Sequence, residues 1–347
     1  MKKSLLCLTL PLVLTTMGCS QQTSKTNFTY WNDCSALTTL KTFVEGATKK
    51  GADTFIPTED RVAVFDMDGT VFGELYPTYF EYIMFVYRAL EDPDYAPNAP
   101  EDVKAVAEEI RLGMPTHTYA SDMAIRHGKA AAKAYANMTI PEFADYVVTF
   151  SKKAVNGFNN LTYANAVYKP MINVVDYLHE NDFNVYLVSG SDRFICRELV
   201  RDPLRIPDDH VIGMDVKLYA THQGDTDGVD YQFTKDDELK RSDEMTIKNL
   251  KFNKVAAIMK EVGKQPVLSF GNTSGDQAMH TYTITNNKYK EAKAFMLVAD
   301  DGDRDNGGSK NDGLHQKWAG MGFHTISMKN DFKTIYGENV TKISSNN

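Results

Sequence analysis

The sequence predicts an α/β fold, a doubly wound, Rossmann-like parallel sheet with an inserted α-helical cap. Three observations support this prediction. Three short apolar runs each end in a polar cluster, amphipathic helices precede the second and third runs, and a long stretch with helical patterns alone separates the first run from the second. Strands buried on both faces and joined by helices are typical of this fold class.

The apolar runs have the composition of buried strands. β-Branched and aromatic residues follow one another without the polar alternation of a half-exposed strand. The runs lie at Val62–Phe65, 185–188 and 267–270, and the polar clusters that follow them lie at 66–70, 189–191 and 271–276. Because ligands of open α/β sheets bind outside the carboxyl ends of the strands, we expect the three clusters to form one site.

Helices are predicted where a parallel sheet needs crossovers. Apolar residues at helical spacing predict a first helix around 37–44 and crossover helices at 170–180 and 254–262. Pro170 fits the first turn of its helix, where its missing N–H costs nothing. The chain therefore alternates strand and helix as a doubly wound core requires.

A helical cap is predicted between the first two strands. Asn98 and Thr139 are each followed three residues later by Glu, which predicts two helices that open with capping boxes. No strand is expected there. We therefore place the core at 19–76 and 168–347 and the cap, as a lid over the strand ends, at 77–167.

Composition limits the possible functions. The chain of 347 residues has 42% hydrophobic residues, 24% charged residues and a formal net charge of −8, which is typical of a globular protein with a mildly acidic surface. A polyanion would meet a repulsive surface, and no stripe of Lys or Arg reverses it. No nucleic-acid partner is therefore expected.

The N-terminus resembles an export signal. Lys2 and Lys3 precede an apolar stretch at 5–14 that is too short for a permanent membrane span. The Gly18-Cys19 junction resembles the lipobox of bacterial lipoproteins, so we expect residues 1–18 to be a signal peptide and Cys19 to carry lipid. The protein would then be exported and anchored in the bacterial cell envelope, in the periplasm or outer membrane, with the lipid as its one membrane contact.

Two cysteines remain for the folded chain. Cys7 leaves with the signal peptide and Cys19 would carry lipid, which leaves Cys34 and Cys196. In an oxidising compartment these two could form a disulfide, and the alternative is a pair of free, buried thiols.

The polar clusters also carry a family resemblance. Four motifs follow one another in register with the predicted sheet: Asp66-Met-Asp-Gly-Thr70, Ser189, Lys254 and Gly271-Asn-Thr-Ser-Gly-Asp276. They resemble the four motifs of the haloacid dehalogenase superfamily, and the helical insert after the first motif resembles the cap of its phosphoserine-phosphatase-like branch. Segments 60–66 and 326–332 resemble exported acid-phosphatase-like members. The resemblance runs from about Trp31 to Tyr336 and implies a Mg²⁺-dependent phosphatase for a small phosphorylated substrate.

The first motif holds the residues expected to perform the chemistry. Phosphoryl transfer needs an in-line nucleophile, positive charge on the equatorial oxygens and an acid for the leaving group. We expect Asp66 to form an aspartyl-phosphate and Asp68 to protonate the departing alkoxide and later take a proton from water. Gly69 would let the backbone turn closely around the phosphate, and Thr70 would pin the loop.

The second and third motifs are expected to bind the phosphate. The Ser189 hydroxyl and the Gly190 N–H would donate to a phosphate oxygen at a helix N-terminus. Lys254 would place a compact positive charge between Asp66 and the phosphate. Lys251, three residues earlier, is the alternative lysine for this role.

Magnesium is the expected cofactor. Asp66, the backbone carbonyl of Asp68 and the last motif would supply oxygen ligands. Asn272 stands where many relatives carry an acid, so either Asn272 or Asp276 would complete the metal site. The alternative for Asn272 is that it only caps a turn.

Several other residues have a functional and a structural interpretation. Arg193 and Arg197 could contact substrate, although ion-paired arginines are commoner. The acidic segment 301–312 mimics a calcium loop, although a polar surface loop fits its sequence better. His117 and His127 are interpreted as structural residues of the cap. Some of five aromatic residues could line the pocket and select the leaving group: Tyr76, Tyr79, Phe80, Tyr82 and Phe85.

The sequence thus predicts a Mg²⁺-dependent phosphatase that hydrolyses small phosphomonoesters through an aspartyl-phosphate on Asp66. A phosphoryl transferase, mutase or pyrophosphatase on the same site is an alternative within enzymes. A lipoprotein that only binds a phosphorylated ligand is the alternative from another class, but such a protein would not need an acid beside a nucleophile.

Overall fold

The computed structural model describes residues 25–74 and 78–343, so the predicted signal peptide and Cys19 lie outside the described residues. The strands are β1 (Val62–Phe65), β2 (Phe158–Asn159), β3 (Asn184–Asp192), β4 (Val211–Ala220), β5 (Leu239–Ile247), β6 (Leu268–Gly271), β7 (Lys293–Val298), β8 (His324–Ser327) and β9 (Thr341–Lys342). The α-helices are α1 (Ser35–Thr48), α2 (Phe80–Leu90), α3 (Glu101–Gly113), α4 (Met123–Ala134), α5 (Ile140–Ser151), α6 (Lys169–Glu180), α7 (Arg193–Leu204), α8 (Phe252–Glu261), α9 (Gln277–Ile284), α10 (Gly313–Ala319) and α11 (Met328–Asp331).

A mostly parallel sheet confirms the predicted fold class. Its strand order is β5-β4-β3-β1-β6-β7-β8, and β1 pairs in parallel with β3 on one side and with β6 on the other. Val64 lies opposite both Tyr186 and Ser269. Only the edge strand β5 runs antiparallel, next to β4. The three predicted strands are therefore neighbours, and the chain leaves the central strand in both directions, as in a doubly wound sheet.

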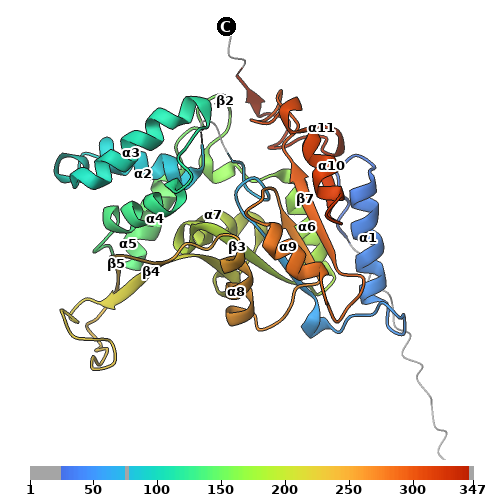
Figure 1. Cartoon of the computed structure of the whole chain (residues 1–347), viewed down its shortest axis with the longest axis horizontal. Coiled ribbons are helices and arrows are strands. Elements are labelled where there is room, and N and C mark those ends of the chain that lie inside the picture. Colours follow the sequence, from blue (N-terminus) through green and yellow to red (C-terminus); the bar gives the residue numbers. More distant parts are fainter. Residues whose placement is uncertain (1–24, 75–77, 344–347) are drawn as a thin grey trace, which may run out of the picture.

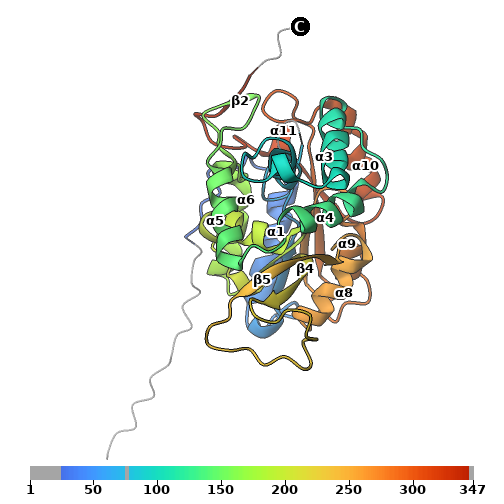
Figure 2. The ribbon, with the colours of Figure 1, turned by 90° about the vertical axis from the view of Figure 1, so that its left-hand side faces the viewer.

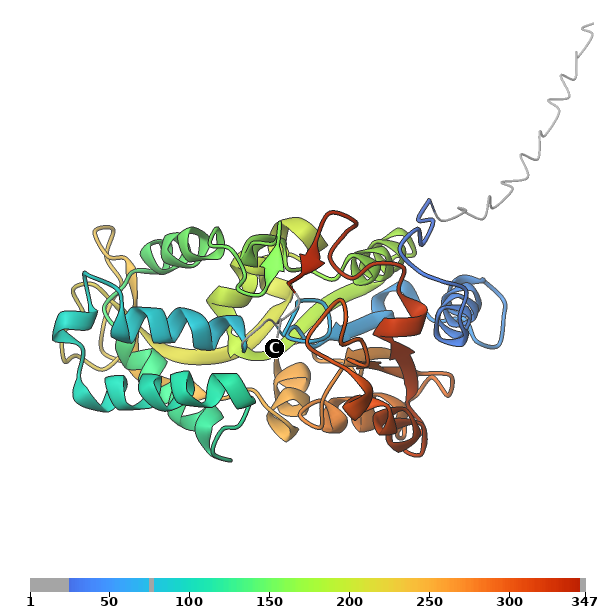
Figure 3. The same cartoon turned by 90° about the horizontal axis from the view of Figure 1, so that it is seen from above.

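The alternation of side chains along β1 explains the layers of the core. Ala63 and Phe65 belong to a large apolar cluster with α1, α6 and α7, whereas Val62 and Val64 belong to a second cluster with α8 and α9. A third cluster, around Trp318, covers β7 with α10. Figure 3 shows these helices on either side of the sheet. A strand covered on both faces needs apolar residues at every position, as this one has.

Helices α2 to α5 lie in the segment that the sequence predicts as a cap, and this segment is called the cap below. They follow β1 and gather to one side of the sheet (Figure 1). The capping box at Thr139 is confirmed, because its hydroxyl accepts the Glu142 N–H and Glu142 accepts the Thr139 N–H. The prediction of a capping box at Asn98 is wrong. Asn98 ends a short 3₁₀ helix, and Pro100 is the N-cap residue of α3. The prediction of no strand in this region is also wrong, since β2 pairs with β9 from the far end of the chain.

A hairpin arm, formed by β4, β5 and the segment 221–238 between them, extends beside the cap (Figure 2). The backbone of Arg241 in β5 exchanges hydrogen bonds with the segment before α5: the Asn137 N–H donates to Arg241 O at 2.8 Å, and the Arg241 N–H donates to Met138 O at 2.9 Å. The side chain of Arg241 is fully buried, pairs with Asp192 at 2.5 Å and stacks over Phe143 of the cap. The arm therefore ties the cap to the core.

The disulfide considered from the sequence does not form. Cys34 is the N-cap of α1, where its Sγ accepts the Leu37 N–H at 3.4 Å, whereas Cys196 is buried in α7. Both thiols are free. Burial raises the pKa of each, which disfavours the reactive thiolate. Among the described residues, no helix is long and apolar enough to cross a membrane.

Candidate active site

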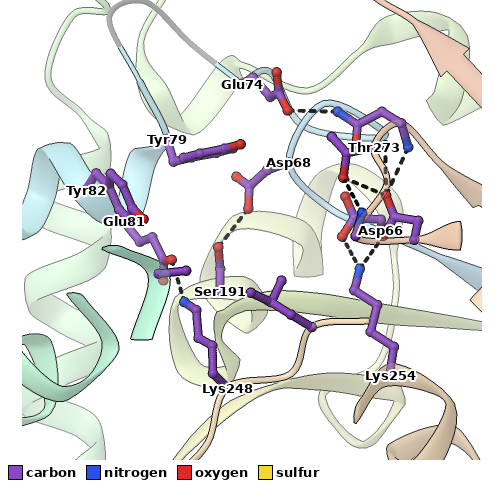
Figure 4. A pocket seen from close by; sticks show the side chains of 16 residues that line it. Asp66, Asp68, Glu74, Tyr79, Glu81, Tyr82, Ser191, Lys248, Lys254 and Thr273 are labelled. Atoms are coloured by element: carbon purple, nitrogen blue, oxygen red, sulfur yellow. Dashed lines mark hydrogen bonds and ion pairs between the residues drawn. The ribbon is translucent and has the colours of Figure 1, made fainter. Parts of the chain in front are cut away.

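The carboxyl ends of three neighbouring strands meet at one pocket. β3, β1 and β6 lie side by side and parallel, so the residues that follow them reach the same edge of the sheet. A cavity of about 140 Å³ lies there, between the core and α2 (Figure 4). Its lining residues are Asp66, Asp68, Glu74, Tyr79, Glu81, Tyr82, Ala124, Gly190, Ser191, Lys248, Leu250, Lys254, Asn272, Thr273, Gly275 and Asp276.

Asp66 is held by one hydrogen bond of its backbone and one of its side chain. Its backbone N–H donates to Phe270 O at 2.9 Å, which joins the end of β1 to β6. Thr70, which is fully buried, donates its hydroxyl to Asp66 Oδ2 in a long hydrogen bond of 3.4 Å. Thr70 therefore contacts the Asp66 carboxylate from a position outside the pocket lining.

Lys254 joins two carboxylates across the pocket. Its Nζ lies 2.5 Å from Asp66 Oδ1 and 2.7 Å from Asp276 Oδ1, and the side chain is about 1% exposed. Burial alone would lower the pKa of Lys254, but Asp276 and Asp66 raise it above its ordinary value. Lys251 is exposed at the N-cap of α8 and does not line the pocket. The structure thus places Lys254, and not Lys251, beside the proposed nucleophile.

Asp276 uses both carboxylate oxygens to organise the loop after β6. Oδ1 accepts from Lys254, and Oδ2 accepts the backbone N–H groups of Asn272 and Thr273, each at 3.1 Å. Burial would raise the pKa of Asp276, but the charge of Lys254 outweighs this effect and the pKa lies below its ordinary value. Asp276 is therefore an ionised partner that fixes Lys254.

Gly69 permits the close approach of the first and last motifs. Its φ is +75°, and a Cβ at this position would lie 1.8 Å from Asn272 Nδ2. The same Asn272 amide donates to Glu74 Oε1 at 2.8 Å. Any side chain at position 69 would therefore displace Asn272 and its contact with Glu74.

Asp68 and Ser191 face one another on the pocket wall. The Ser191 hydroxyl donates to Asp68 Oδ2 at 2.7 Å. Ser189, the predicted phosphate ligand, is fully buried instead, and its Oγ accepts the Ser191 N–H at 3.0 Å. Ser189 thus lies behind the pocket, and Ser191 supplies the hydroxyl on its surface.

Gly190 lines the pocket, but the prediction that it lies at a helix N-terminus is wrong. β3 continues to Asp192 and α7 begins at Arg193, so Gly190 belongs to a strand and not to a helix N-terminus. A Cβ on Gly190 would lie 2.5 Å from Leu250 Cδ2, which explains why a glycine occupies this place.

A second buried ion pair closes the cap side of the pocket. Glu81 of α2 accepts from Lys248 Nζ at 2.9 Å and from the Asp192 N–H at 3.3 Å. Both charged side chains are less than one-tenth exposed. Despite burial, which would raise it, the pKa of Glu81 is lowered by the charge of Lys248. This pair joins the cap to the core beside the site.

The pocket carries more negative than positive groups. Burial and then repulsion from Asp276 raise the pKa of Asp66 to about 7. Burial and the charge of Asp66 raise the pKa of Asp68 well above its ordinary value, and burial raises the pKa of Glu74 to about 7. Five carboxylates line the wall with two lysines, so added positive charge would stabilise their ionised forms.

The oxygen donors fit a hard divalent cation. Over the residues that the structure describes, no three His, Cys, Asp or Glu side chains form a ready-made metal centre, so backbone and amide oxygens would have to contribute. Asp66, the backbone carbonyl of Asp68 and the amide oxygen of Asn272 would be the donors, and the excess negative charge of the pocket favours a cation. Asp276 holds Lys254 through Oδ1 and the Asn272 and Thr273 N–H groups through Oδ2, so it orients the loop that carries Asn272.

Sequence reasoning missed several pocket residues. Glu74 follows the first motif without a recognisable pattern, and Glu81 and Lys248 are brought together from distant parts of the chain. Ser191 belongs to the second polar cluster, so its presence was visible but not its role. Tyr79 and Tyr82 line the wall, as considered for the aromatic residues after the first motif. Phe80 and Phe85 are buried in the core, and Tyr76 lies outside the described residues.

The remaining candidates are structural. Arg193 pairs with Asp215 and Glu261. Arg197 donates to a backbone carbonyl on the surface. His127 is about 1% exposed and packs among aromatic rings of the cap.

Two carboxylates of the acidic segment 301–312 contact other protein groups. Asp301 pairs with Arg304, and Asp305 accepts from the hydroxyls of Tyr168 and Tyr336. His117 is exposed at the edge of a neighbouring cavity of about 270 Å³, which also has Asp305 in its wall. Both carboxylates are buried, so this part of the segment is not the exposed polar loop that the sequence predicts.

Comparisons with known proteins agree with the fold. No family model and no curated protein matches the chain. It is similar in structure to a conserved protein of unknown function from Anaerococcus prevotii, with a TM-score of 0.51 and 13% identity over 89% of this chain and 98% of the other. Because the identity is so low, the likeness shows a shared α/β fold and nothing of activity.

Two further solved structures match at lower TM-scores. A phosphoserine phosphohydrolase-like protein from Francisella tularensis has a TM-score of 0.38 and 14% identity over 69% of this chain and 88% of its own. Cytosolic 5′-nucleotidase IIIB bound to cytidine has a TM-score of 0.45 and 12% identity over 84% of each chain. The fold and site together define a Rossmann-like α/β protein with a buried carboxylate–lysine centre.

Proposed function

We propose that this protein is a Mg²⁺-dependent phosphatase that hydrolyses small phosphomonoesters through an aspartyl-phosphate on Asp66. One observation carries the proposal. Lys254 Nζ contacts the carboxylates of both Asp66 and Asp276, and Asp68, two residues after Asp66, lines the same small pocket. A nucleophile, a fixed cation and an acid are the groups that phosphoryl transfer requires of a protein.

In the first step, Asp66 Oδ attacks the phosphorus of the ester. The new bond joins phosphorus to the aspartate oxygen, and the bond from phosphorus to the leaving oxygen breaks. Asp68, as a carboxylic acid, gives its proton to that oxygen, so the alcohol leaves neutral. Burial favours the protonated form of Asp68 before this step.

In the second step, water attacks the phosphorus of the aspartyl-phosphate. The Asp68 carboxylate takes one proton from the water, the bond from phosphorus to Asp66 breaks, and inorganic phosphate leaves. The enzyme returns to its starting protonation state, so Asp68 acts first as acid and then as base.

The other groups bind and orient the phosphoryl group. Lys254 and the Gly190 N–H would face its oxygens, and Tyr79 and Tyr82 of the cap side would limit the entry of water. A Mg²⁺ ion held by Asp66, the Asp68 carbonyl and Asn272 supplies, when bound, positive charge that stabilises the transferred group.

The test is release of inorganic phosphate from 4-nitrophenyl phosphate and glycerol 2-phosphate by the purified chain. We expect turnover that EDTA abolishes and excess Mg²⁺ restores. Asp66→Asn should lower kcat by more than about 10³-fold, because it removes the nucleophile. Asp145→Asn, which changes an exposed carboxylate of the cap, should not alter kcat.

The outcome also separates the alternatives. A phosphorylated Asp66 peptide in the acid-quenched enzyme would support the covalent intermediate. Full activity of a folded Asp66→Asn variant would refute the nucleophile assignment, and phosphate binding without turnover by the unchanged chain would indicate a ligand-binding protein.

We also propose, from the sequence, that the protein is exported and lipid-anchored at Cys19. Radiolabelled palmitate should be incorporated in bacteria that express the full chain, and Cys19→Ser should abolish the incorporation. Label retained by Cys19→Ser would contradict the anchor.

A further inference from the structure

The two carboxylate oxygens of Asp68 have different surroundings. Oδ2 accepts the Ser191 hydroxyl at 2.7 Å. Oδ1 is buried and has no hydrogen-bond partner among the residues that the structure describes. The two residues are 123 positions apart and come from the loop after β1 and from β3 (Figure 4). One oxygen is therefore held by the protein, and the other is left for a further interaction.

Ser191 is fixed by the backbone around it. The pairing of β3 with β4 is regular up to Val188 and resumes at Asp192 after a register shift, so Ser191 lies in an irregular part of the strand. Irregularities of this kind re-aim a side chain next to active sites. The Ser191 N–H donates to Ser189 Oγ, and a Cβ on Gly213 would lie 2.8 Å from Ser191 O. Ser191 is 4% exposed, and Ser189 and Gly213 both limit the position of its backbone.

This contact leaves one Asp68 oxygen without a partner in the described part of the chain. While the Ser191 hydroxyl donates to Oδ2, Oδ1 is the oxygen that is free to interact with a substrate. We propose that Ser191 is a positioning residue, which holds Asp68 so that Oδ1–H faces the leaving oxygen of the phosphate ester. This inference rests on the proposed function. The Oδ1 proton moves to the leaving oxygen as the ester bond breaks, and water later returns a proton to the carboxylate.

A positioning role differs from a merely structural one in its dependence on the leaving group. 4-Nitrophenolate departs as a stable anion and needs little help from an acid, whereas an alkoxide such as that of glycerol 2-phosphate must be protonated. Loss of Ser191 should therefore affect alkyl esters more than the nitrophenyl ester. A general loss of pocket structure would affect both alike.

The experiment compares kcat/KM of the full-length Ser191→Ala variant for the two esters in the presence of Mg²⁺. This ratio reports steps up to cleavage of the ester bond, so it isolates the step in which Asp68 is the acid. As Asp68 gives up its proton it becomes a carboxylate, and the Ser191 hydroxyl then stabilises a charged group. We therefore expect kcat/KM for glycerol 2-phosphate to fall about 10- to 100-fold, and that for 4-nitrophenyl phosphate to fall less than about 3-fold.

Further variants keep the test independent of folding. Ser191→Thr retains the hydroxyl and should recover alkyl-ester activity, whereas the similarly sized Ser191→Cys should not. Ser151→Ala removes a buried hydroxyl that donates to Val148 O in the cap, and it should leave kcat/KM for both esters unchanged. In an Asp68→Asn background, Ser191→Ala should have no further effect on the alkyl ester, because the acid is already gone.

The outcomes separate this inference from the proposed function. Equal losses on both esters in Ser191→Ala, with an active parent enzyme, would overturn the positioning role alone. Additive losses in the double variant would do the same. Absence of phosphate release from either ester by the parent enzyme would overturn the proposed function, and this inference with it.

Discussion

At the residue scale, the site depends on a few buried charges. Lys254 brings Asp66 and Asp276 together, since both carboxylates bond its Nζ. Removing one member of a buried ion pair leaves an uncompensated charge, which costs more than the pair contributes when intact. Lys254 should therefore matter for folding as well as for catalysis.

We expect Lys254→Met to abolish phosphate release and to lower the free energy of unfolding at pH 8 by about 3–5 kcal/mol. Lys254 lowers the pKa of both Asp66 and Asp276, so the pKa of each should be higher in the variant than in the parent. Protonation at lower pH then stabilises the folded variant more than the folded parent, and the deficit should shrink as the pH falls toward 5. Urea titration at both pH values measures this. Lys260→Met, on the exposed face of the same helix, is the control, and an equal loss from it would contradict the prediction.

His127 offers a second test at a single position. Burial lowers its pKa from 6.5 to about 4, and its ring packs between Tyr82 and Phe85. Between pH 6.5 and 4 the unfolded chain binds this proton and the folded chain does not, so stability falls as the pH is lowered through that window, by about 1.4 kcal/mol per unit.

We expect His127→Phe to keep the stability of the parent at pH 7.5, because a phenyl ring suits the aromatic surroundings and leaves no polar atom unpaired. Its unfolding free energy should then fall less steeply than that of the parent between pH 6.5 and 4. Urea midpoints over this range provide the measurement, and parallel pH profiles of the two proteins would refute the prediction.

At the element scale, the hairpin arm of β4, β5 and the segment 221–238 decides how the cap is held. Arg241 in β5 bonds Asp192 at the end of β3 and stacks over Phe143 in α5. It therefore joins three elements at one buried point. The neighbouring pair of Lys248 and Glu81 fixes α2 in the same way.

Arg241→Met should lower the free energy of unfolding by about 3–5 kcal/mol, because Asp192 would remain buried without its cation. Lys133→Met removes the cation of an exposed pair with Asp102 in the cap and should cost less than about 1 kcal/mol. Urea unfolding of the two variants gives the comparison. Similar costs would mean that the buried pair does not secure the arm.

At the scale of the whole molecule, cap and core share one apolar cluster. Phe80, Phe143 and Phe150 of the cap belong to the same buried set as Phe65 and Leu187 of the sheet. An interface of this kind couples the stability of the two parts, because neither can separate without exposing apolar surface.

We therefore expect cap and sheet to unfold together. Hydrogen exchange followed by mass spectrometry in increasing urea should show the amides of α5 and β1 losing protection at one common midpoint. Earlier loss of protection in α5 would show that the cap opens as an independent unit.

Much of this arrangement could be predicted from the chain, because it depends on local patterns. The apolar run Val62–Phe65 specifies a strand buried on both faces, and the acids after it are adjacent in sequence. Lys254 and Asp276 were likewise found from their motifs. The edge strand β5 was not predicted, because its residues are largely polar and it owes its pairing to β4 and the cap.

The sequence by itself determined the fold class, the three strand ends and the identity of the groups around Asp66. The tertiary structure alone decided that Ser191 and not Ser189 lines the pocket, in the part of β3 where the pairing with β4 changes register. It also decided that Lys248 meets Glu81, 167 residues away. A sequence motif reflects residues that are close together in the chain. The position of Ser191 and the contact of Lys248 with Glu81 follow instead from the packing of distant elements, which a local pattern does not encode.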